Sequence, residues 1–153
     1  MQYISEMMTT LKVFCHDLKT GVTSLLMEAT KDMNSYTLSY NGDFIIYGKN
    51  IKNEKSKDGF KRHDGVEDRA PWWRNQTHLY MYDVKHCTHR QLTAGKYSSN
   101  LHDISYDGKR ILISQNIRDY KTPHYSKQVM MEINLQNNSI DTLWNSHHNG
   151  SAQ

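Results

Sequence analysis

Two stretches of this chain are near copies of each other: "LSYNGDFIIYGKN" at Leu38–Asn50 and "ISYDGKRILISQN" at Ile104–Asn116, 66 residues further on. Each contains Ser-Tyr, then Asn or Asp followed by Gly, then two residues and an apolar run. Gly accepts a positive φ in a tight turn, and Asn or Asp hydrogen-bonds its own backbone there. Each stretch therefore predicts a strand, a turn and a returning strand.

The copy extends well beyond these turns. With a shift of 66 residues, the register runs without gaps from Val13 to Gly48, and a partial third copy follows at a shift of 51, where Asp83 aligns with Asn134. Each unit consists of a hairpin signature followed by the strand-turn-strand, giving four short antiparallel strands. Four-stranded repeats of about 50 residues predict β-propeller blades, and a β-sandwich with chance similarity is the alternative fold.

The repeat divides the chain into parts of three blades. Residues 11–30 are expected to end a first blade, 35–93 to form a complete blade with an insertion at 50–77, and 100–145 to form an incomplete third blade, because the next Ser-x-Asp-Gly turn would fall beyond Gln153. A propeller needs about four or more blades to close its ring. We therefore expect an all-β, partial, unclosed propeller, which is either a piece of a longer protein whose missing blades are its partners or a unit that needs partners at two open edges.

Composition narrows the class of protein. The chain has 153 residues, 37% hydrophobic and 23% charged, with a net charge of +3 and a mean hydropathy of −0.82. No apolar run is long enough for a transmembrane helix, and the N-terminus lacks the features of a signal peptide. The basic residues are interspersed with acidic ones, so neither a membrane span nor nucleic-acid binding is expected.

The blade motif resembles that of TolB-like propellers. "HLYMYDVKHCTHRQLTAGKYSSNLHDISYDGKRILIS", residues 78–114, contains a strand ending in Tyr82-Asp83, then Gln91-Leu92-Thr93, then Ser105-Tyr106-Asp107-Gly108-Lys109-Arg110-Ile111. The same motif fills the N-terminal propeller of the prolyl oligopeptidase family, which includes dipeptidyl peptidase IV. Tyr40 and Tyr106 depart from the family pattern, which often has Pro at this place.

Two further segments resemble secreted bacterial members of that family: "EDRAPWWRNQTHLYMYDV" at 67–84 and "RDYKTPHYSKQVMMEINLQNNSIDTLW" at 118–144. The catalytic part of such peptidases is missing, because the sequence has no G-x-S-x-G motif and no α/β-hydrolase pattern. The resemblance implies a propeller that gates and positions a peptide substrate for a C-terminal α/β-hydrolase domain of the parent chain. It also implies a periplasmic or secreted parent, and we expect this chain alone to be inactive.

The insertion contains the main candidate site. In dipeptidyl peptidases a propeller insertion supplies acidic residues that hold the free amino terminus of the substrate, and Glu67 and Asp68 resemble that pair in type. In the alternative interpretation, the tryptophans pin the loop to the blade and the acids pair with nearby arginines. The candidate substrate-binding residues are Glu67, Asp68, Arg69, Trp72, Trp73 and Arg118.

Arg118 begins a loop at the same position in the next blade as the insertion. A local salt bridge is the alternative role for Arg118. No metal or other cofactor is expected, because His86, Cys87 and His89 lie in a predicted hairpin turn and match no zinc spacing.

Two other functions share the blade features. One is a non-catalytic TolB-like propeller that binds proteins through loops at one end of the ring. The other is a propeller-type oligogalacturonate lyase, which would hold a metal with histidines. The residues that follow Gln153 in the parent discriminate all three.

Overall fold

The computed structural model describes residues 12–28, 31–52, 75–118 and 126–146, and these form ten strands without a helix. The strands are β1 (Lys12–His16), β2 (Thr23–Glu28), β3 (Met33–Leu38), β4 (Phe44–Ile51), β5 (Gln76–Asp83), β6 (Thr88–Gln91), β7 (Ser98–Ile104), β8 (Arg110–Arg118), β9 (Ser126–Asn134) and β10 (Ile140–Asn145). All pairings are antiparallel. No helix in the described ranges is long and apolar enough to cross a membrane.

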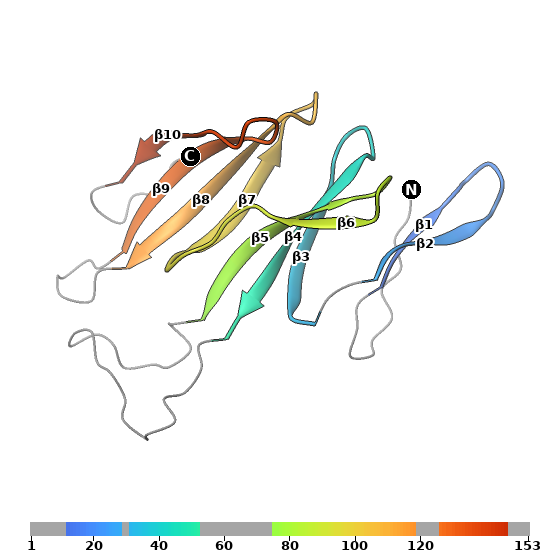
Figure 1. Ribbon diagram of the computed structural model, residues 1–153, viewed down its shortest axis with the longest axis horizontal. Helices are drawn as coiled ribbons and strands as arrows, with labels where there is room; N and C mark the ends of the chain where they lie inside the picture. The colour runs from blue at the N-terminus through green and yellow to red at the C-terminus, as the bar shows by residue number, and fades with distance from the viewer. Residues whose placement is uncertain (1–11, 29–30, 53–74, 119–125, 147–153) are drawn as a thin grey trace, which may run out of the picture.

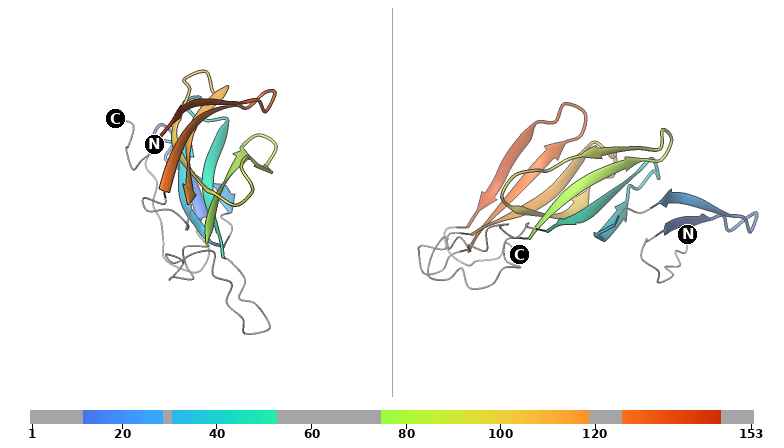
Figure 2. Two further views of the ribbon diagram at one scale, coloured as in Figure 1. Left: turned by 90° about the vertical axis from the view of Figure 1, so that its left-hand side faces the viewer. Right: turned by 60° about the horizontal axis from the view of Figure 1, so that its bottom comes forward.

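The strands form three separate sheets that follow one another in chain order (Figures 1 and 2). The β1–β2 hairpin comes first, then the sheet β3-β4-β5-β6, then the sheet β7-β8-β9-β10. The sheets lie in an arc that does not close, which confirms the partial propeller predicted from the repeat. The strands also keep the predicted spacings, since β3 and β4 recur as β7 and β8.

One boundary differs from the prediction. The third blade was predicted to be incomplete over 100–145, whereas β7–β10 make a four-stranded sheet over 98–145. The prediction marked the end of each blade by the next Ser-x-Asp-Gly turn. The structure instead completes the blade with the β9–β10 hairpin, so that turn would begin the following blade.

The repeated Ser-Tyr-Asn/Asp-Gly sequence makes the same turn in both blades. The backbone N–H of Phe44 donates to the Ser39 hydroxyl over 3.1 Å, and that of Arg110 donates to the Ser105 hydroxyl over 2.9 Å. Gly42 and Gly108 have φ values of 79° and 67°, a region that side chains disfavour. The duplicated sequence therefore encodes a duplicated turn.

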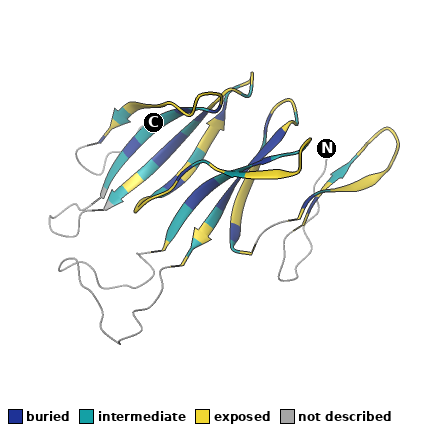
Figure 3. Cartoon of the chain, viewed as in Figure 1, coloured by how far each residue is buried: buried dark blue, intermediate teal, exposed yellow. Residues whose placement is uncertain are grey.

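Strand β4 has apolar residues on both faces because it lies between two neighbouring sheets. Phe44 and Ile46 belong to the cluster shared with β5, β7, β8 and β9, whereas Ile45 and Tyr47 belong to the cluster shared with β1, β2 and β3. Successive strand residues point to opposite faces, so alternate residues serve alternate interfaces. Figure 3 shows the resulting buried stripes on β4 and β8 and the exposed residues of the β1–β2 hairpin.

A hydrophobic core lies between the two four-stranded sheets. Its buried members are Phe44, Ile46, Leu79, Ile104, Ile111, Ile113, Ile133 and Leu135, with Met81 and Met131 packed against them. Each such residue contributes about 1.5–3 kcal/mol on full burial. Packing of one blade on the next is therefore the main source of stability, and each sheet depends on its neighbour.

Candidate functional site

The residues predicted from the insertion, Glu67, Asp68, Arg69, Trp72 and Trp73, lie outside the described residues. Arg118 is the last residue of β8, where its backbone pairs with Ser126 of β9. The strand ends that flank the two connections, at β4–β5 and β8–β9, lie at the same end of the molecule (Figure 1). The predicted elements of the site are therefore attached at one end of the two blades.

A polar network ties the base of the insertion to β3. The Asn34 side-chain amide donates to Asn50 Oδ1 over 2.9 Å, and the Thr77 hydroxyl donates to the same oxygen over 2.9 Å. Asn50 precedes the insertion and Thr77 follows it, so one oxygen holds both of its ends. The Ser35 hydroxyl donates to Asn34 Oδ1 over 3.1 Å, which fixes the orientation of that amide.

Two further contacts strengthen this base. The backbone N–H of Asn50 donates to the Asp32 carbonyl over 2.9 Å, and Lys52 Nζ lies 3.2 Å from the Asp32 carboxylate. On the other side, the backbone N–H of Thr77 donates to the Ser98 hydroxyl over 3.1 Å, which joins β5 to the start of β7. The insertion therefore starts and ends on a fixed platform.

A pocket of about 260 Å³ lies beside this network, between the two four-stranded sheets. Its walls come from β3, β4 and β5 of one sheet and from β7 of the next. Three apolar side chains line it together with seven small or polar residues. The lining residues are Asn34, Ser35, Thr37, Ile46, Gly48, Thr77, Leu79, Ser99, Asn100 and Leu101.

Gly48 keeps this pocket open and the network intact. A Cβ at this position would meet Asn34 Oδ1 at clashing distance, Ser35 Oγ at 2.8 Å and Thr77 Cγ2 at 3.3 Å. Any larger residue would therefore displace the side chains that hold the base of the insertion. Close approach of neighbouring groups, rather than a special backbone angle, accounts for glycine here.

His78 directly follows Thr77 of the network in the sequence. It is buried, and its Nδ1 atom has no hydrogen-bond partner among the residues that the structure describes. Burial lowers the pKa of His78, and a hydrogen bond with the backbone of Gly95 opposes this shift. The imidazole is therefore neutral near pH 7 and adds no charge to this end of the blades.

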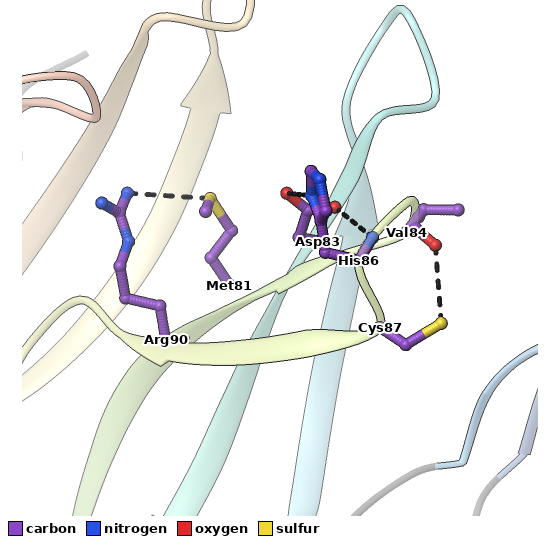
Figure 4. Close-up of polar contacts among 6 residues, drawn as sticks. All are labelled: Met81, Asp83, Val84, His86, Cys87 and Arg90. Carbon is purple, nitrogen blue, oxygen red and sulfur yellow. Dashed lines mark hydrogen bonds and ion pairs between the residues drawn. The ribbon is translucent and has the colours of Figure 1, made fainter.

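The β5–β6 hairpin, which contains the His-Cys-x-His sequence, makes local contacts (Figure 4). The His86 ring lies 3.0 Å from the Asp83 carboxylate, and this side-chain contact, together with a hydrogen bond from the His86 backbone, lowers the pKa of Asp83. A hydrogen bond with Cys87 and burial raise the pKa of Tyr82 to about 12. Within the described ranges, no group of three or more His, Cys, Asp or Glu residues is positioned to hold a metal ion.

Arg90 of β6 joins the two four-stranded sheets. Its Nη2 atom donates to the Leu135 carbonyl over 3.1 Å and lies 3.9 Å from Met81 Sδ, the contact drawn in Figure 4. Its Nη1 atom donates to the Asn138 side chain over 3.4 Å. This clamp links β6 of one sheet to the end of β9 and the turn that follows it in the next sheet.

The network and the pocket were not predicted from the sequence. Asn34, Asn50 and Thr77 are separated by 16 and 27 residues, and only the pairing of β3 with β4 and of β4 with β5 brings them together. One signal was available: the polar residues Asn50 and Thr77 bracket the insertion directly. Predicted hairpin register could have placed them opposite each other.

Comparison with known proteins identifies the fold of this chain. No family profile matches it, and no curated protein sequence matches it significantly. Among solved structures, the acylaminoacyl peptidase of Pyrococcus horikoshii matches 90% of this chain with a TM-score of 0.64 and 15% identity. A putative TolB from Agrobacterium tumefaciens matches 88% (TM-score 0.51, 14% identity), and the propeller domain of the trilobed protease from Pyrococcus furiosus matches 90% (TM-score 0.50, 9% identity).

These likenesses establish the architecture: the chain is a partial β-propeller of the kind found in peptidase and TolB propeller domains. It spans 22% of the length of the acylaminoacyl peptidase, 41% of the TolB protein and 35% of the trilobed protease domain. At identities of 9–15% the comparison shows the fold and leaves activity to be argued from the site.

Proposed function

We propose that this chain is the propeller portion of an exported serine peptidase of the prolyl oligopeptidase family, of dipeptidyl-peptidase type. The likeness to the acylaminoacyl peptidase propeller over 90% of the chain carries the proposal. The propeller restricts access to a hydrolase domain of the parent chain and helps to position a peptide. Catalysis belongs to that hydrolase domain.

The fixed base of the insertion supports a positioning role. A binding loop must return to the same place for each substrate, and the shared Asn50 oxygen anchors both strands from which the insertion departs. In this proposal Glu67 and Asp68 accept hydrogen bonds from the ammonium group of a substrate. Charge-assisted hydrogen bonds of this kind contribute about 1.5–3 kcal/mol each.

The first experiment measures the affinity of the full chain for a tripeptide with a free amino terminus and for its acetylated form. We expect the free form to bind about tenfold or more tightly. The double variant Glu67→Gln, Asp68→Asn removes this preference, whereas the matched exposed pair Glu28→Gln, Asp141→Asn keeps it. Equal binding of both peptides by the unmodified chain would contradict the assignment of the acids.

The second experiment concerns activity. We expect the chain alone to show no turnover of dipeptidyl chromogenic substrates. We expect the longer chain encoded by the parent gene to cleave the same substrates. Turnover that stays with the isolated chain through further purification would refute the division of labour. A parent gene that encodes blades and no G-x-S-x-G motif would refute the peptidase.

A TolB-like protein-binding propeller is the second candidate, because the Agrobacterium TolB structure matches 88% of the chain. That function predicts a protein partner bound through loops at one end of the ring. It predicts no preference for a free amino terminus, so the tripeptide comparison separates the two candidates.

A further inference from the structure

The pocket between the two sheets has an unusual wall. Three consecutive residues of β7, Ser99, Asn100 and Leu101, line it. Successive side chains of a strand point to opposite faces, so three neighbours border one pocket only where the edge of the strand itself faces it. β7 is an edge strand of its sheet, so its main-chain groups on that side have no strand partner within the described residues.

The opposite wall supplies hydroxyl groups and an apolar floor. Thr37 and Ser35 come from β3, the edge strand of the other sheet, and Ile46 and Leu79 lie beneath them. In the register of the sheet, Thr37 pairs with Ile46 and Ser35 with Gly48, so these side chains share the face toward β7. The pocket thus combines a free strand edge, uncharged hydrogen-bonding groups and a small apolar surface.

The composition of the pocket indicates which class of ligand fits it. Its ten lining residues include no acidic, basic or aromatic side chain. A charged ligand would lose its hydration without gaining a counter-charge. Base-stacking and cation–π recognition need an aromatic face, which these residues lack. A peptide main chain, in contrast, offers the alternating N–H and C=O groups that a free strand edge pairs with.

We propose that this pocket binds a short, extended, uncharged peptide segment, which adds to the free edge of β7. The peptide main chain pairs with β7, the hydroxyl of Thr37 contacts it from β3, and small side chains reach the floor formed by Ile46, Leu79 and Leu101. The volume of about 260 Å³ is slightly below the roughly 300–1,000 Å³ of typical small-molecule sites, which limits the bound segment to a few residues.

This inference rests on the proposed function, because it names the part of a substrate that the propeller holds. It assigns recognition of the main chain to the pocket and leaves recognition of the amino terminus to the insertion. The two assignments are separable, since a peptide blocked at both ends has no ammonium group for the acids to bind.

The test is a titration of the ¹⁵N-labelled full chain with acetyl-Ala-Ser-Ala-amide, at a concentration where sedimentation shows a single species. We expect saturable shifts of the Ser99, Asn100 and Leu101 amide signals. An analogue with N-methylated peptide bonds binds about tenfold more weakly, because it has lost the donors that pair with the strand edge.

Two variants complete the test. Thr37→Trp fills the pocket from an exposed strand position and lowers the affinity about tenfold or more, whereas Thr142→Trp, an exposed threonine of β10, leaves it within about twofold. If Thr37→Trp does not fold, the comparison of the peptide with its N-methylated analogue still tests the proposal. Absence of saturable shifts at β7, equal binding of the N-methylated analogue, or tighter binding of a neutral xylo-oligosaccharide than of the peptide would overturn the proposal.

The results also distinguish this proposal from the proposed function. A preference for free amino termini that depends on Glu67 and Asp68, without any binding of the blocked peptide, would leave the proposed function standing and remove this inference. Binding of the blocked peptide without that preference would do the reverse.

Discussion

Replacement of Gly48 by Ala tests whether the packing around the base of the insertion is as close as the structure shows. In an ordinary strand this change stabilises a protein by about 0.5–1 kcal/mol, because glycine has more conformational freedom to lose. At this site the new methyl group would meet Ser35 Oγ at 2.8 Å and clash with Asn34 Oδ1. The Asn34 side chain must therefore turn away from Asn50.

The cost follows from the hydrogen bonds that Asn34 gives up. It donates to Asn50 over 2.9 Å and accepts from Ser35 over 3.1 Å. Each such bond contributes about 0.5–1.5 kcal/mol, and these exposed ones belong to the lower half of that range. A loss of about 1–2 kcal/mol exceeds the conformational gain, so Gly48→Ala destabilises the chain by about 0.5–1 kcal/mol.

A double-mutant cycle separates the clash from other effects. In the background Asn34→Ala, Ser35→Ala the two closest obstructing atoms are gone and only Thr77 Cγ2 at 3.3 Å remains, so Gly48→Ala should then stabilise the chain by up to about 0.5–1 kcal/mol. Urea unfolding followed by circular dichroism measures all four proteins. The reasoning is refuted if Gly48→Ala stabilises the unmodified chain, or if its effect has the same sign and size in both backgrounds.

Three further predictions concern the blades. Arg90→Met keeps the side-chain stem but removes the hydrogen bond to the Leu135 carbonyl, and we expect a loss of about 1–2 kcal/mol in urea unfolding; unchanged stability would contradict the clamp. Burial lowers the pKa of His78 in the folded state, so the unfolded chain binds a proton at this residue more readily. The free energy of unfolding should therefore fall as the pH drops below about 6.5, the ordinary pKa of histidine. His78→Phe should make this pH dependence weaker in urea unfolding measured at several pH values. Phe14 and Leu25 are exposed on the first hairpin, and their joint replacement by Ser should reduce concentration-dependent association in sedimentation, with no change counting against that surface.

The arrangement of the strands was predictable because the information is local. Ser39 and Ser105 each accept a hydrogen bond from a backbone five residues later, and Gly42 and Gly108 supply the positive φ between them. These contacts lie within a few residues, so a sequence repeat translates directly into a structural repeat. The alternation of Ile45 and Ile46 between two interfaces also follows from the strand period.

The site depended on contacts that no local pattern encodes. The Asn34 amide reaches Asn50 and Thr77 only after three strands have paired. A glycine such as Gly48 within a strand indicates from sequence only that the strand is weakened, whereas here its missing side chain leaves room for the Asn34 amide. The end of the third blade differs for another reason: the prediction placed it at the next Ser-x-Asp-Gly turn, whereas the β9–β10 hairpin completes the four-stranded sheet.

The two outward-facing surfaces of the arc differ in chemistry. On the sheet β7–β10, the face away from the core has an ion pair between Arg110 and Glu132 at 3.5 Å and a hydrogen bond between His102 and Ser114 at 2.8 Å. These groups satisfy one another, and covering them with an apolar partner would gain little.

The first hairpin instead exposes Phe14 at 36% and Leu25 at 46%, with Val13 and Met27 buried against the next sheet. A β-hairpin with apolar residues on both faces requires a neighbour on each side, as a central propeller blade does. The last strand, β10, also exposes Ile140 at 57% and Leu143 at 59%, so the apolar surface that a neighbour could cover is present in the last sheet as well as at the β1–β2 end of the arc.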